Sequence, residues 1–106
     1  MVVYESETSD ESIYQSIEIY EKTAPKRFIC RVVYRYSRFK RDQTLERQFS
    51  IDGICEITLD EGEFDVKILS VEANGEIDCE QYIAYIIEDL YRELIEEINT
   101  FKTKSD

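Results

Sequence analysis

Apolar and polar residues alternate with a period of two through most of the first two thirds of the chain. This period places successive side chains on opposite faces of a strand, so one face can be buried while the other meets solvent. The pattern predicts an antiparallel meander of about five strands. They cover residues 13–22, 27–36 and 44–51, a fourth segment that ends at Leu59, and a fifth that ends at Ala73-Asn74-Gly75.

Turn residues separate the strands and, together with the apolar positions, set their registers. Pro25 ends the first strand because proline cannot continue a ladder of backbone hydrogen bonds. We predict a three-residue loop at 51–53, with Gly53 in the left-handed conformation, and a turn at 60–63. Aligning apolar residues then requires these pairs: Ile19–Cys30, Ile17–Val32, Tyr36–Leu45, Val32–Phe49, Phe49–Cys55, Leu45–Leu59, Leu59–Phe64 and Ile57–Val66.

Charged residues on the other face of the sheet support these registers. The predicted strand pairs bring together three sets of opposite charges: Glu18 with Arg31, Arg35 with Glu46, and Glu56 with Lys67. Opposite charges directly across from each other stabilise a sheet by about 0.2–1 kcal/mol per pair. The registers are chosen from the apolar residues alone, so these charge pairs are independent support for the meander.

The apolar period lengthens to three and four residues in segment 78–101, which predicts one long amphipathic helix. Asp78 can cap the free N–H groups of its first turn, Gln81 can reach back to complete a capping box, and Ile77 can pack on Tyr82. The helix covers the inward face of the sheet, so the fold class is α+β. Its apolar stripe consists of Cys79, Ile83, Ile86, Ile87, Leu90, Leu94, Ile98 and Phe101.

The chain of 106 residues is long enough for one hydrophobic core and short enough to predict one domain. Segment 1–12 is acidic and rich in serine, so we predict a flexible arm there, with an edge strand over residues 2–4 as the alternative. Residues 13–101 form the α+β domain, and residues 102–106 form a short tail.

Composition argues against most kinds of chemistry. The chain has no histidine, and none of the phosphate-binding, dinucleotide or nucleophile motifs is present, so we expect no enzyme and no cofactor. Its three cysteines have no metal-binding spacing and lie at apolar positions, so we expect buried thiols and no metal. The acidic turn around Asp60 is a weak calcium candidate and is better explained as a solvated hairpin tip. With no leader and no long apolar run, we expect a cytoplasmic protein that does not contact a membrane.

Charge is distributed unevenly along the chain and suggests a nucleic-acid-binding function. The net charge is −11 overall, but +7 over residues 22–47 and −13 over residues 48–101. Segment 34–41 interleaves basic and aromatic residues, as nucleic-acid-binding surfaces do. The long-range field of an acidic protein would still repel a polyanion. The residues expected to make contact are Arg38, Phe39, Lys40 and Arg41.

The polar side of the predicted helix favours a different class of function. Its carboxylates could imitate nucleic-acid phosphates, so the chain could be an inhibitor or adaptor that binds a nucleic-acid-handling enzyme, although an exposed helix face is most often only solvated. The residues that would carry this DNA mimicry are Glu88, Asp89, Glu93 and Glu96.

The outward face of the sheet favours a third function, binding to another protein or to a second copy of the chain. In the predicted registers this face shows apolar and aromatic side chains among its charges, and homodimers most often form by pairing identical surfaces. The helix flank at Tyr91 and Ile95 is an alternative dimer surface. We therefore expect an acidic, non-enzymatic, protein-binding module that forms a homodimer, with nucleic-acid binding as the alternative. The apolar residues assigned to the sheet face are Tyr14, Tyr20, Ile29, Val33, Leu69 and Val71.

Overall fold

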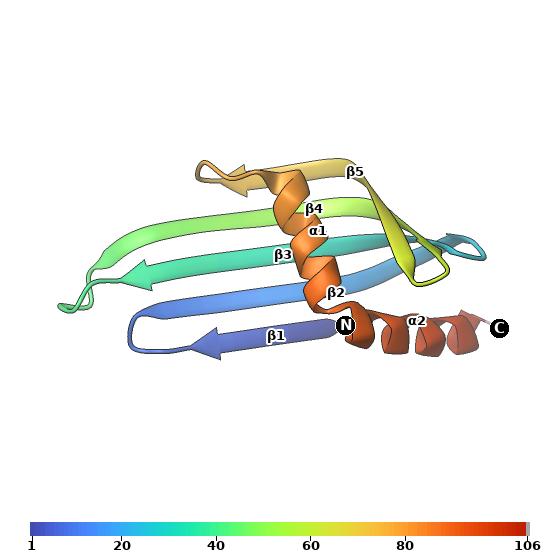
Figure 1. Cartoon of the computed structure of the whole chain (residues 1–106), viewed down its shortest axis with the longest axis horizontal. Helices are drawn as coiled ribbons and strands as arrows, with labels where there is room; N and C mark the ends of the chain where they lie inside the picture. Colours follow the sequence, from blue (N-terminus) through green and yellow to red (C-terminus); the bar gives the residue numbers. More distant parts are fainter. Residues whose placement is uncertain (106) are drawn as a thin grey trace.

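A computed structural model describes the backbone of residues 1–105 and the side chains of residues 1–101 (Figure 1). The described chain forms one five-stranded antiparallel sheet in the order β1-β2-β3-β4-β5, followed by two helices. The predicted α+β class and the meander are both confirmed. The elements are β1 (Val2–Glu7), β2 (Glu11–Ala24), β3 (Arg27–Phe39), β4 (Leu45–Asp60), β5 (Glu63–Asn74), α1 (Cys79–Asp89) and α2 (Tyr91–Ser105).

Two hairpin turns have the geometry that their residues favour. Pro25 and Lys26 connect β2 to β3, because Ala24 and Arg27 are already paired. Glu61 and Gly62 connect β4 to β5 with φ values of 47° and 84°. Two successive left-handed residues match the right-handed twist of the flanking strands. Both turns lead into the predicted registers, so the pairs Ile19–Cys30 and Leu59–Phe64 are confirmed.

The predicted loop at 51–53 is wrong, because β4 continues through it as one strand. Gly53 does not have a positive φ. A Cβ atom added to Gly53 would lie 3.0 Å from Ile83 Cδ1, so glycine is needed here because α1 packs directly on the strand. The pairs that depended on the loop, Phe49–Cys55 and Leu45–Leu59, are wrong as well, because all of these residues lie along β4. The predicted pairs between β3 and β4 are also wrong: Tyr36 faces Phe49, Val32 faces Gly53, and Arg35 faces Ser50.

The expected N-terminal arm forms strand β1 and the turn into β2, and the alternative edge strand extends beyond residues 2–4 to Glu7. Val2 pairs with Ile17 and is buried in the main core. The terminal amino group of Met1 lies 3.1 Å from Glu97 Oε1 on α2. An acidic composition therefore did not prevent order, because one apolar residue reaches the core and the rest of β1 is hydrogen-bonded along β2.

The predicted single helix is two helices that meet at Leu90. Asp78 caps α1 as expected, since its Oδ1 accepts a hydrogen bond from the Gln81 N–H at 3.1 Å. Helix α1 crosses the strands, whereas α2 runs beside β1 and β2 (Figure 1). The molecule measures 52 × 22 × 21 Å. A straight helix over the predicted segment 78–101, at about 1.5 Å per residue, would be longer than the sheet is wide. The change of direction keeps Leu90, Leu94 and Ile98 buried.

Both helices lie on one face of the sheet and form one core with it (Figure 1). Cys30 and Cys55 face each other on β3 and β4, and both are free and fully buried. Burial raises the pKa of each thiol to about 12, so both remain protonated near neutral pH. α2 extends to Ser105 and so takes in most of the predicted tail, whose last residue, Asp106, lies outside the described residues.

Candidate functional site

The face of the sheet opposite the helices is not covered by any described element, and we call it the uncovered face. A paired charge lies at its centre. Arg31 on β3 donates two hydrogen bonds to Asp52 on β4, from Nε to Oδ1 at 2.9 Å and from Nη2 to Oδ2 at 2.6 Å. These bonds from the guanidinium lower the pKa of the Asp52 carboxyl and raise the pKa of Arg31. The pair therefore keeps its charges matched over a wide pH range.

The other β3 arginines on the uncovered face also have partners. The Arg35 guanidinium lies over the Tyr14 ring, 5.1 Å from its centroid, which is a cation–π geometry. Arg27 lies 3.9 Å from Glu56. These contacts arise because Arg27, Arg31 and Arg35 recur at every fourth residue of β3 and so share one face, while the neighbouring strands supply carboxylates and a ring.

Small and aliphatic side chains lie between these charged groups. Ser16 and Val33 face each other across β2 and β3 and are only 4% and 6% exposed, although no helix covers them. Ile29 and Ile54 are half-buried beside them. The uncovered face thus combines paired charges with an aliphatic centre.

One apolar residue predicted to lie on the uncovered face, Val71, lies on the other side of the sheet. A register shift between Ile54 and Cys55 in the β4–β5 ladder leaves Leu69 without a direct partner in β4. Beyond this bulge the side chains of β5 change face, so Val71 lies opposite Gly53, on the side of the helices. Leu69 remains exposed at the edge of the sheet. The alternative dimer surface on the helix flank is used within the fold, because Tyr91 stacks on Phe64 and Ile95 packs against the core.

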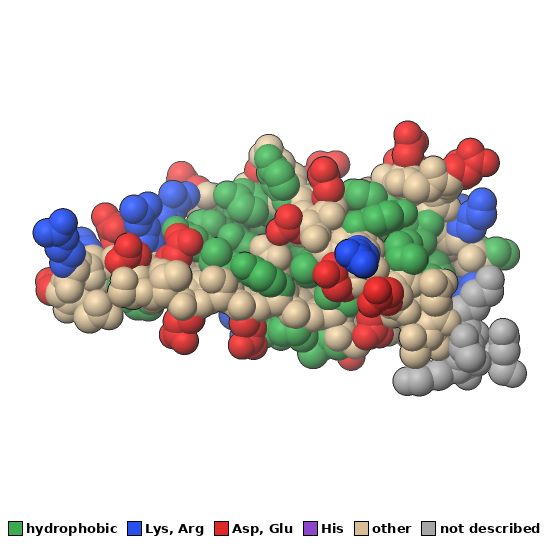
Figure 2. Space-filling view, turned by 60° about the horizontal axis from the view of Figure 1, so that its bottom comes forward, with side chains coloured by type: hydrophobic (Ala, Val, Ile, Leu, Met, Phe, Trp, Pro, Cys, Tyr) green, Lys and Arg blue, Asp and Glu red, His purple; other side chains and the backbone are tan. Residues whose placement is uncertain are grey.

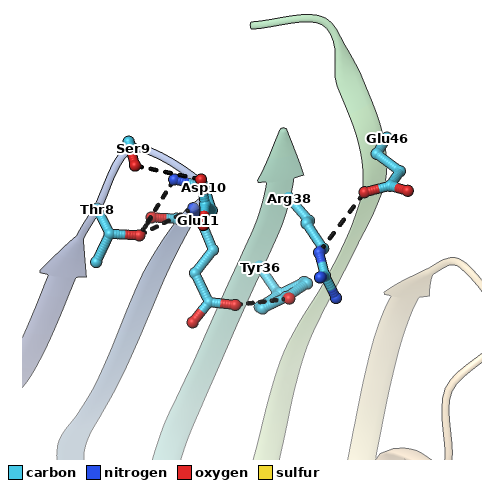
Figure 3. Close-up of polar contacts among 7 residues, drawn as sticks. All are labelled: Thr8, Ser9, Asp10, Glu11, Tyr36, Arg38 and Glu46. Atoms are coloured by element: carbon cyan, nitrogen blue, oxygen red, sulfur yellow. Dashed lines mark hydrogen bonds and ion pairs between the residues drawn. The ribbon is translucent and has the colours of Figure 1, made fainter. Parts of the chain in front are cut away.

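The predicted nucleic-acid-binding residues lie at the end of the β3–β4 hairpin, which is farthest from the helices (Figure 1). Arg38 and Phe39 belong to β3, and Lys40 and Arg41 begin the loop. Figure 2 shows Lys and Arg side chains gathered at this end of the molecule, with carboxylates beside them. Arg38 Nε lies 3.6 Å from Glu46 Oε2 on β4 (Figure 3). Among the described residues, Lys40 and Arg41 form no ion pair.

Local hydrogen bonds fix the shape of this end. The Tyr36 hydroxyl donates to Glu11 Oε2 at 2.8 Å, which raises the pKa of Tyr36 (Figure 3). The Thr44 hydroxyl and N–H both donate to Asp42 Oδ1, at 2.6 and 3.0 Å, and close the loop. Acidic groups therefore partly neutralise the basic hairpin end.

The four helix carboxylates do not share one surface. Glu88 and Asp89 lie at the end of α1, and Glu93 and Glu96 lie on α2, beyond the change of direction at Leu90. They border three different hollows: Glu88 lies near Phe64 and Tyr91, Asp89 near Tyr34 and Tyr82, and the α2 pair near the N-terminus. DNA mimicry remains a prediction, but the four carboxylates do not form the continuous stripe along one helix that it assumes.

Two residues of the uncovered face were missed in the sequence. The predicted loop at 51–53 includes Asp52, and the predicted sheet face does not include Ile54. The apolar or glycine positions Ile51, Gly53, Cys55 and Ile57 continue the period of two without a break, and this signal could have placed Asp52 and Ile54 on the opposite face of one strand.

Comparisons of the chain with models of known protein families, with curated proteins and with solved structures find no match. Within the described residues, no group of three or more histidine, cysteine or acidic side chains is placed to hold a metal ion. No described helix has both the length and the apolar character needed to cross a membrane.

Proposed function

We propose that this protein is a non-enzymatic protein-binding module that self-associates through the uncovered face of its sheet. The observation that carries the proposal is the bidentate Arg31–Asp52 pair, which lies beside the small and aliphatic side chains of Ser16, Val33 and Ile54. Burying an isolated charge in an interface is costly, whereas a charge that already has its partner and its hydrogen bonds costs much less. The Arg31–Asp52 pair can therefore be buried without leaving either of its two charges unpaired.

The arrangement also suits the pairing of two identical copies. A face that carries both signs of charge presents complementary groups to itself when it is rotated by a two-fold axis. A stable interface needs about 800 Å² from each partner, which is roughly a ninth of the 7233 Å² surface of this chain. One face of a five-stranded sheet can supply an area of this order.

Light scattering at increasing protein concentration tests the proposal. We expect the measured mass to approach twice the 12.6 kDa of one chain. Ile54→Glu should return the mass to that of a monomer, because the new carboxylate would lie across from Arg31, which already binds Asp52, and one of the two acidic charges would have to be buried unpaired. Val71→Glu is the matched control, since Val71 is 40% exposed and lies opposite Gly53, on the side of the helices. A single-chain mass at every concentration would reject self-association.

A second candidate, nucleic-acid binding by the hairpin end, is favoured by one observation: the exposed side chains of Lys40 and Arg41 have no ion-pair partner among the described residues. Fluorescence anisotropy with a single-stranded oligonucleotide at low salt tests it. Binding should be lost in Lys40→Glu/Arg41→Glu and kept in Lys22→Glu/Lys67→Glu, which changes the net charge equally at other positions. Equal loss in both variants would mean that only overall charge matters.

A further inference from the structure

A hollow on the covered side of the molecule, between α1 and the strands, has a composition that none of the proposed functions uses. Its volume is about 370 Å³, which falls within the range of small-ligand sites. We call it the tyrosine pocket. It is lined by Gln15, Tyr34, Tyr82, Tyr85, Ile86 and Asp89.

The fold brings these six residues together from three elements. Gln15 on β2 and Tyr34 on β3 are direct partners in the sheet. The other four lie on α1 at positions 82, 85, 86 and 89, a spacing of three and four residues that places them on one side of a helix. Gln15, Tyr34 and Ile86 are buried, Tyr82 is half-buried, and Tyr85 and Asp89 are exposed at the rim.

Aromatic rings surround the pocket. The Tyr82 ring centroid lies 5.7 Å from that of Tyr34 and 6.3 Å from that of Tyr85, with the planes tilted by 44° and 57°. Phe49 supports Tyr34 and Tyr82 from behind, with its centroid 5.7 Å from each. Tilted rings around one space present π-electron faces from several directions, which is the arrangement that attracts organic cations.

One of the residues that line the pocket has a buried polar atom without a partner. Gln15 is 9% exposed, and its Oε1 accepts no hydrogen bond from the described residues. An unpartnered buried carbonyl oxygen is uncommon in folded proteins, and it can be satisfied by a ligand that carries an N–H or O–H donor.

The charges around the pocket determine whether it favours a cation or an anion. None of the residues that line the pocket is basic, and the one ionised group is the Asp89 carboxylate at its rim. Burial is the largest cause that raises the pKa of Tyr34, and the neighbouring tyrosines and the carboxylates of Glu11 and Asp89 raise it further. An anion would meet unfavourable charge here, whereas a cation would meet a carboxylate, an amide oxygen and aromatic faces.

We propose that the tyrosine pocket binds a primary alkyl-ammonium group, with its N–H groups donating to Gln15 Oε1 and Asp89 and its methylenes lying against Tyr82 and Tyr85. The group could come from a lysine side chain of a protein or from a free amine. The proposal goes beyond self-association through the uncovered face and does not depend on it.

NMR titration of the isotope-labelled protein tests the proposal with four probes at equal ionic strength. n-Butylammonium and an acetylated Gly-Lys-Gly amide should give saturable shifts at the Gln15 side-chain amide and the Ile86 methyl groups. Butyrate has the opposite charge and should not bind. Tetramethylammonium lacks N–H donors and should bind about tenfold more weakly than n-butylammonium. Tighter binding of the peptide than of n-butylammonium would identify a protein lysine as the source, and equal binding would identify a free amine.

Variants locate the site. Asp89→Asn and Tyr85→Leu change exposed residues, so the fold is preserved, and each should weaken n-butylammonium binding by about tenfold. Gln15→Met should abolish the preference for n-butylammonium over tetramethylammonium. Glu88→Gln removes the same charge as Asp89→Asn from the neighbouring position and should leave affinity unchanged. Absence of saturable shifts with both ammonium probes, or equal losses in Asp89→Asn and Glu88→Gln, would overturn the proposal.

Discussion

The two faces of the sheet are built by the same strands, but they hold their side chains in different ways. The covered face is mostly apolar, and the side chains beneath α1 and α2 are buried because the helices lie on them. The uncovered face buries Val33 and Ser16 without a helix, while long arginine and tyrosine side chains pair around them. The comparison teaches that one face is covered within the chain, whereas the other gives its β3 arginines partners and leaves Ile29 and Ile54 accessible.

The largest expected effect is a difference in stability between two variants, each of which shortens one apolar side chain on one face of the sheet. Leu94→Ala on the covered side should lower the free energy of unfolding by about 2–5 kcal/mol, because Leu94 is fully buried and its removal leaves a cavity. Ile54→Ala on the uncovered face should cost about 1 kcal/mol in a dilute monomeric sample. Urea denaturation followed by circular dichroism measures both. Equal losses would contradict the difference between the faces.

A smaller effect tests how closely α1 packs on β4. Gly53→Ala should lower the free energy of unfolding by about 1–3 kcal/mol, because the added Cβ would lie 3.0 Å from Ile83 Cδ1 and the fully buried Ile83 has little room to move away. Ile83→Val removes that carbon atom. The double variant should therefore be more stable than the sum of the two single losses predicts, by about 1 kcal/mol. Strict additivity would show that the contact does not explain the glycine.

The smallest effect concerns the Arg31–Asp52 pair. Asp52→Asn should lower stability near neutral pH by about 1 kcal/mol, a value that allows for the partial exposure of both side chains. The pKa of Asp52 is lowered in the folded state, so the stabilisation is complete above the ordinary carboxyl pKa of 3.8 and is lost as the pH falls through the folded value.

Urea denaturation at several pH values checks this dependence. The difference between the wild type and Asp52→Asn should be constant above about pH 5 and should shrink in stronger acid. Asp65→Asn, which removes a carboxylate without an ion-pair partner among the described residues, should show a much smaller difference at neutral pH. A difference of the same size for both variants would indicate a general charge effect.

Local signals in the sequence were sufficient for most of the fold. Pro25 and Gly62 marked two turns correctly, and Asp78 marked the start of α1, because each acts through its own backbone geometry. Gly53 misled for the opposite reason: it follows an aspartate as in a hairpin, yet it serves a contact with Ile83, thirty positions along the chain.

The two remaining differences also depend on tertiary structure. Leu90 is an ordinary helix residue, and the helix ends there because α1 reaches the side of a narrow sheet. Val2 gives little local signal, and β1 forms because that residue reaches the core beside Ile17.

The candidate sites were less predictable than the fold. The arginines of β3 could be placed on one face from alternation alone, but the partner of Arg31 could not, because Asp52 was assigned to a loop. The tyrosine pocket combines Gln15 and Tyr34 with residues of α1, and its existence depends on where the helix crosses the sheet. No spacing within one segment contains that information.

The most direct test of self-association through the uncovered face uses methyl NMR with a soluble paramagnetic probe. The methyl groups of Ile29, Val33 and Ile54 should be broadened by the probe in dilute protein and become protected as the protein concentration rises. The methyl groups of Val71, which is 40% exposed on the side of the helices, should be broadened equally at all concentrations. Unchanged broadening of the three uncovered-face residues from the lowest to the highest concentration would contradict the account.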